Sequence, residues 1–198
     1  MAFLPMPYSK GYPVALANGE ARVDVTDLYV ASRGIPFIWR RTYSPLANFD
    51  GIYGFNWTNA YDRQIQVVTG GVSLADGLGR EDFYQDTGGG TYAAPPGLFD
   101  RLVLSGGIWT QTVAQGMKYT YNASGWLTQI QDRAGNTMTI TRNAHNHISQ
   151  IEDTQGRLYT VAYTNSGPNQ KFLSLTDFSG LVIVYTLDVN GDLFKVRS

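Results

Sequence analysis

Residues 122–135 decide the fold, and they read Asn122-Ala-Ser-Gly125-Trp-Leu127-Thr-Gln-Ile130-Gln-Asp132-Arg-Ala-Gly135. The same pattern returns 21 residues later as Asn143-Ala-His-Asn146-His-Ile148-Ser-Gln-Ile151-Glu-Asp153-Thr-Gln-Gly156. A third copy, displaced by 24 residues after an insertion around residues 167–168, carries Phe172, Leu175, Asp177 and Gly180. A fourth copy opens with Asp188, Gly191, Leu193 and Val196. Four registers that agree at several positions each predict a repeat protein.

Each unit contains two turn signals. The first turn opens with a short polar side chain that can bond the backbone two residues on, and these residues are Asn122, Asn143 and Asp188. It closes where a positive φ is expected, at Gly125, Asn146 and Gly191. The second turn opens at Asp132, Asp153 and Asp177 and closes at Gly135, Gly156 and Gly180. Two turns and two short strands per unit make a β-hairpin.

An apolar pair with a three-residue offset recurs in every unit. The pairs are Leu127/Ile130, Ile148/Ile151, Phe172/Leu175 and Leu193/Val196. Strict strand alternation puts residues three apart on opposite faces, so we expect a β-bulge or a strong twist that brings both side chains to one core. Because a single hairpin is marginal in water, the hairpins should stack into one long antiparallel sheet whose buried face is covered.

The fold class predicted from these features is all-β. Helical periodicity is nearly absent, and strand and turn signals continue through the N-terminal half, including a turn signal at residues 17–19. We divide the chain into a β-rich segment that introduces the repeats, residues 1–118, and the hairpin repeats, residues 119–198, continuous with it. The last unit stops midway, so we expect a fragment of a longer protein.

Composition excludes several classes of function. Lys and Arg number 15 against 16 Asp and Glu, and they are scattered, so nothing forms a basic footprint for nucleic acid. The chain has no cysteine, which excludes a disulfide scaffold and a thiolate zinc site. No apolar run reaches the length of a membrane-spanning helix, and the N-terminus does not have the pattern of a secretory signal.

Three groups of residues could carry chemistry, and each has a simpler interpretation. His145 and His147 lack a third metal ligand and fall in a repeat turn. Residues 188–192 are similar to part of a calcium loop but lack its glycine and its terminal glutamate. The aspartates at 132, 153 and 177 recur with the repeat, which favours a turn role over paired catalytic acids. We therefore predict no catalytic, cofactor-binding or metal-binding residue, and we expect no enzyme activity.

The repeat resembles that of the Rhs/YD-repeat family, which includes bacterial Rhs and wall-associated proteins, toxin-complex C subunits and animal teneurins. It is similar to the family pattern from Tyr121 to Gly135, although Asn replaces the usual Asp at positions 122 and 143. The N-terminal half is similar to the segment that introduces the repeats in Rhs proteins. That similarity rests on four motifs, Pro13 to Gly19, Thr26 to Leu28, Gly34 to Tyr43 and Gly54 to Asp62.

The resemblance implies a β-strip that spirals into a hollow shell, which in bacterial members can enclose a C-terminal toxin. It also implies a secreted or cell-surface bacterial protein, exported without an N-terminal signal peptide in this segment. We expect a structural shell segment that encapsulates or displays a toxin or effector, with the rest of its own chain as partner. The alternatives are an adhesion module that binds surface glycans through exposed aromatic side chains, and an assembly protein that self-associates through its sheet edges. No nucleic acid and no membrane span are expected.

Overall fold

The chain is built of β-strands, as the sequence predicts, in a computed structural model that describes residues 22–45, 49–165 and 171–198. The described residues form no helix, and hence none that could cross a membrane. The turn signal at residues 17–19, the motif from Pro13 to Gly19 and the insertion around 167–168 lie outside these ranges.

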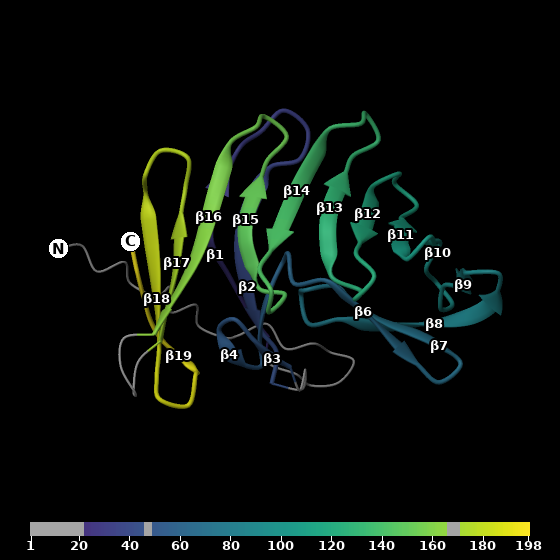
Figure 1. Cartoon of the computed structure of the whole chain (residues 1–198), viewed down its shortest axis with the longest axis horizontal. Helices are drawn as coiled ribbons and strands as arrows, with labels where there is room; N and C mark the ends of the chain where they lie inside the picture. Colours follow the sequence, from purple (N-terminus) through teal and green to yellow (C-terminus); the bar gives the residue numbers. More distant parts are fainter. Residues whose placement is uncertain (1–21, 46–48, 166–170) are drawn as a thin grey trace.

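One curved antiparallel sheet of fourteen strands, the strip, makes up most of the molecule (Figure 1). Its strands are neighbours in the order of the sequence, as expected for stacked hairpins. They are β6 (Gln64–Val68), β7 (Gly71–Ala75), β8 (Glu81–Gly88), β9 (Thr91–Ala93), β10 (Arg101–Ser105), β11 (Ile108–Thr112), β12 (Lys118–Tyr121), β13 (Leu127–Gln131), β14 (Thr137–Arg142), β15 (Ile148–Glu152), β16 (Leu158–Asn165), β17 (Lys171–Thr176), β18 (Val182–Leu187) and β19 (Leu193–Arg197). The predicted boundary between residues 118 and 119 falls inside β12.

A smaller sheet, formed by the N-terminal part of the chain, lies behind the strip (Figure 1). It consists of β1 (Val23–Val30), β2 (Phe37–Tyr43) and β5 (Trp57–Asn59), with the short hairpin of β3 (Asp50–Gly51) and β4 (Gly54–Phe55) beside it. We call residues 22–45 and 49–62 the inner segment.

The core lies between the inner segment and the strip, because alternate side chains of the strip are buried against it. Met138 and Ile140 in β14 and Ile183 and Tyr185 in β18 are buried in this way. The ring of Phe37 stacks on that of Tyr159 with centroids 3.6 Å apart. Burial of aromatic and branched side chains on one face is what holds each otherwise marginal hairpin in place.

The N-terminal end of the strip bends back on itself. The backbone N–H of Ile65 in β6 donates to the carbonyl of Gly125 at 2.8 Å, and that of Leu127 donates to the carbonyl of Arg63 at 3.2 Å. Strand β6 therefore meets the start of β13, seven strands away in the sheet order. A Cβ at position 125 would lie 1.9 Å from the Ile65 carbonyl oxygen, so this contact requires glycine.

Candidate functional site

Six turns of the repeats share one hydrogen-bonding scheme that their first residue creates. In the first of them, the N–H of Asn122 donates to the carbonyl of Trp126, and the N–H of Gly125 donates to the carbonyl of Asn122. The N–H of Trp126 also donates to Oδ1 of Asn122 at 3.0 Å. The same three bonds recur in the turns that begin at Asp132, Asn143, Asp153, Asp177 and Asp188.

The fourth residue of each turn has a positive φ. These residues are Gly125, Gly135, Asn146, Gly156, Gly180 and Gly191. Asn146, at φ 62°, stands where the other copies have glycine, and asparagine is among the residues that tolerate this region. The turns at 122, 143 and 188 lie at one edge of the strip and those at 132, 153 and 177 at the other, as hairpin connectivity requires. The side-chain Oδ1 atoms of these Asn and Asp residues accept backbone N–H groups.

A β-bulge accounts for the three-residue offset of the apolar pairs in three of the four units. The extra residue is Thr128 opposite β12, Ser149 opposite β14 and Phe194 opposite β18. The hydroxyls of Thr128 and Ser149 each donate to a carbonyl of the facing strand, at 3.2 Å in both copies. The bulge shifts the alternation by one, so that Leu127, Ile130, Ile148 and Ile151 are all buried, while Leu193 and Val196 in the last strand are half-buried.

The third unit differs from the pattern assigned to it. Strands β16 and β17 pair without a register shift, and β17 buries Leu173 and Leu175 at ordinary two-residue spacing. Phe172 is therefore only half-buried and does not occupy the position of Leu127 and Ile148. The displacement of 24 residues aligned Phe172 with these residues, whereas without a bulge the alternation selects its neighbour Leu173.

Two further turns before the repeats share part of the hydrogen-bonding scheme of the repeat turns. Asp76 repeats the whole side-chain scheme, because its Oδ1 accepts the N–H groups of Leu78 and Arg80. Residues 113–117 repeat only the backbone bonds, since Val113 offers no side-chain acceptor. In the sequence, the turn at Asp76 has the spacing of the repeat turns, because Gly79 follows three residues later. The turn at Val113 has only the glycine, Gly116.

The inner segment is fixed to the turns at both edges of the strip. At one edge, Nη2 of Arg157 donates to the carbonyl of Ala31 at 2.8 Å, and Oγ1 of Thr154 donates to the carbonyl of Arg33 at 2.7 Å. At the other edge, the N–H of Phe55 donates to Oδ1 of Asp192 at 3.0 Å. The turns thus close the hairpins and hold the inner segment in place.

A buried ion pair lies where the inner segment meets the turn at residues 143–147. Nη1 of Arg142 is 3.4 Å from Oδ1 of Asp62, and both side chains are 4% exposed. The same guanidinium donates to three backbone carbonyls, those of Leu127, Asn146 and Tyr61, at 3.1, 2.8 and 2.7 Å. It also lies 4.7 Å from the ring centre of Trp126. Arg142 is therefore held by one carboxylate and three backbone carbonyls.

Asp62 is less well satisfied than its partner. Its Oδ2 is buried and accepts no hydrogen bond in the described structure. Burial raises the pKa of the Asp62 carboxyl above its ordinary value, and the charges of Arg142 and His147 oppose that rise. A buried acceptor without a donor is costly, and such groups in native proteins call for an explanation.

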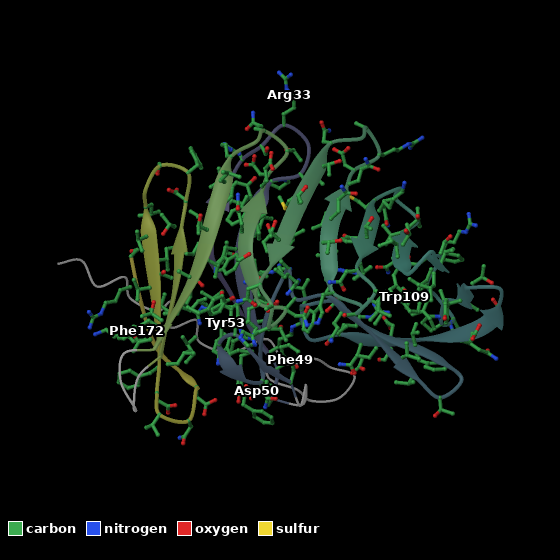
Figure 2. The ribbon with its side chains drawn as sticks, viewed as in Figure 1. Arg33, Phe49, Asp50, Tyr53, Trp109 and Phe172 are labelled. Carbon is green, nitrogen blue, oxygen red and sulfur yellow. The ribbon has the colours of Figure 1, made fainter. Side chains whose placement is uncertain are left out.

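A cleft of about 540 Å³ opens beside Asp62 at this edge of the strip. Its walls are residues 49–52 of the inner segment and the turns at 143–147 and 190–191, and its floor is formed by β16, β17 and the end of β18. Figure 2 shows Phe49 and Asp50 at the lower edge of the molecule, with Phe172 to their left, and all three line the cleft. These segments are far apart in the sequence, and only the fold brings them together.

The histidines of the repeat turn stand at this cleft. The rings of His145 and His147 are 6.2 Å apart, and that of His147 is 5.0 Å from Tyr163. Partial burial lowers the pKa of His147, and the nearby charge of Asp62 acts in the opposite direction. Within the described ranges, no three His, Asp or Glu side chains are grouped to hold a metal ion.

Comparison with known proteins assigns part of the chain. A family model described as a domain of unknown function (DUF6531) matches residues 11–84, which contain the described part of the inner segment and β6 to Tyr84 in β8. No curated protein matches the chain.

Proposed function

We propose that this chain is a structural segment of an exported β-shell, of the Rhs/YD-repeat type, that encapsulates or displays a toxin or effector. The observation that carries the proposal is that the last strand of the strip, β19, is an edge strand with one side left unpaired among the described strands. Among the described strands β19 pairs only with β18, yet its side chains Leu193 and Val196 already pack against the core. A further hairpin added at this edge would continue both the hydrogen bonds and the buried face.

The inner segment supports the same proposal. Its side chains pack on buried rings of β16 and β18, and it is tied to the turns at both edges, so this part of the strip is filled. In a longer strip, later strands would have no inner segment of their own and would enclose a space. The present segment would then form the closed end of a shell.

The edge can be tested on the chain itself. An exposed strand edge invites pairing with another chain. We expect the wild-type chain to self-associate with increasing concentration in light scattering after size exclusion. The variant Phe194→Lys, which puts a charge on an exposed position of the edge strand, should shift it to monomer. The control Phe99→Lys changes a more exposed residue outside the strands and should leave association unchanged. A monomer at every concentration with fast amide exchange in β19 would contradict the open-edge argument.

Encapsulation of a C-terminal part is tested on the protein that the whole natural reading frame encodes. If residues beyond the repeats are encoded, we expect trypsin to spare them as long as the strip is folded and to digest them once it is unfolded. Equal digestion of that region in the folded and unfolded protein would overturn encapsulation, as would a reading frame that encodes no further residues.

A further inference from the structure

We propose that the cleft beside Asp62 binds a neutral saccharide, with Asp62 accepting a hydrogen bond from a ring hydroxyl. The inference is independent of the shell proposal, because it concerns a site completed within these 198 residues. Its volume, about 540 Å³, lies within the range of small-ligand sites.

Asp62 is the buried polar side chain on which this site depends. Its side chain is 4% exposed and lines the cleft, and its Oδ1 is held by Arg142. Oδ2 has no donor in the described structure. The carboxylate is therefore fixed in orientation by one oxygen and left with acceptor capacity on the other, which is the state of a binding group that awaits a donor.

Charge selects the class of donor. The Arg142 guanidinium already sits 3.4 Å from Asp62, so the pair has no net charge and a second cation would meet a cation at close range. An anionic ligand would face the carboxylate. A neutral hydroxyl avoids both penalties, because it can donate to Oδ2 without bringing a charge into a buried position.

The rest of the cleft suits a ligand with several hydroxyls. Asn143 uses its Oδ1 for the turn, which leaves its amide N–H groups available, and Asn146 and Asn190 present further amides at the rim. The imidazole of His147 also lines the cleft and can form a hydrogen bond with a hydroxyl. Phe172 and Trp126 supply flat apolar surface for the C–H face of a sugar ring, and aromatic lining with a few polar groups is typical of small-ligand sites.

The experiment is a titration of isotopically labelled protein with N-acetylglucosamine, maltose and galactose, followed through amide and indole N–H resonances. We expect at least one sugar to shift the indole resonance of Trp126 and the amides of residues 143–147, with a dissociation constant in the millimolar range. Asp62→Asn should weaken that binding at least tenfold. Gln155→Ala, an exposed change in a turn at the opposite edge, should leave it unchanged.

Two further arms keep the proposal falsifiable. His147→Ala changes an exposed residue and should weaken binding severalfold even if Asp62→Asn fails to fold. Guanidinium and glucuronate should cause smaller shifts at the cleft than the neutral sugars. The proposal is overturned if no sugar shifts the cleft resonances, if folded Asp62→Asn or His147→Ala binds as wild type, or if either ion binds better than the neutral sugars.

Discussion

The phenol of Tyr185 donates a 2.9 Å hydrogen bond to Oδ2 of Asp27, which lies 158 residues earlier in the chain. The same carboxylate oxygen accepts Nε of Arg41 at 2.8 Å, and both charged side chains are 8% exposed. Tyr185 belongs to the strip and Asp27 to the inner segment. This bond therefore joins the two sheets through a buried charge.

Replacing Tyr185 by phenylalanine should lower the free energy of unfolding by about 1–3 kcal/mol. The buried carboxylate of Asp27 loses a donor, while the ring at position 185 keeps its packing. Tyr163→Phe is the control, since that phenol donates to the neutral carbonyl of Ile148. We expect a loss of about 1 kcal/mol there. Urea denaturation of both variants measures the difference, and equal losses would show that the charge of Asp27 adds nothing.

Alanine at two glycines of the repeat turns should separate strain from steric clash. Gly125 and Gly135 have similar φ values of 81° and 90°, but a Cβ at 135 would meet open space. Gly135→Ala should cost about 1–2 kcal/mol for the left-handed backbone alone. Gly125→Ala should cost more and loosen the contact of β6 with β13, measured as faster exchange of the Ile65 amide. Similar stability of the two variants would refute the clash at Gly125.

Deleting the bulge residue Thr128 should prevent folding. Without the extra residue, the strand slips by one position, and the side chains on one side of the deletion turn to the opposite face. Thr128→Val keeps the bulge and loses only the bond to the carbonyl of Thr120, so it should cost about 1 kcal/mol. Circular dichroism and thermal unfolding of both proteins decide this. A deletion variant that melts like Thr128→Val would show that the bulge does not set the register.

The pH dependence of stability should reveal Asp153. Burial acts to raise its pKa, but the N–H of Gln155 and the Arg157 guanidinium outweigh burial and hold the pKa below its ordinary value. A carboxyl with a depressed pKa in the folded state stabilises the fold above the unfolded pKa, near 4, and this is lost as pH falls through the folded pKa. Asp153→Asn should therefore be about 1–3 kcal/mol less stable at pH 7, a difference that disappears toward pH 2.

Asp177→Asn is the matched control for this effect. Asp177 opens the equivalent turn, and its hydrogen bonds to Ser179 and the turn backbone also lower its pKa against burial, but no arginine of the described ranges pairs with it. We expect the same direction of change with a smaller loss at pH 7. If the two variants showed the same pH profile, the Arg157 ion pair would not be the source of the larger loss at Asp153.

The sequence was most informative where a local pattern sets the structure. The Asx residues and glycines mark turns because the acceptor and its N–H partners lie within four residues, as at Asn122 and Trp126. The three-residue offset of Leu127 and Ile130 indicates a bulge because strand parity is local. The same reasoning failed for Phe172, because an insertion hides whether the next strand carries a bulge.

The cleft could not be read in advance. Asp62 lies 80 residues from Arg142, and no local pattern around either residue predicts that they pair. The sequence predicts that His145 and His147 lie in a repeat turn, but it does not predict their neighbours in the cleft, which come from the inner segment and from β17. Contacts between segments this far apart depend on how the strip curves, which no local pattern encodes.

The placement of the inner segment at the start of the chain has a consequence for biosynthesis. A ribosome releases the inner segment long before β16 and β18, so the rings of Phe37 and Tyr53 emerge without Tyr159 and Tyr185, whose rings contact them. The nascent chain must keep these apolar surfaces from aggregation until most of it has been made. The inner segment can therefore complete its packing only late in translation. A chaperone that binds exposed apolar side chains is most needed until then.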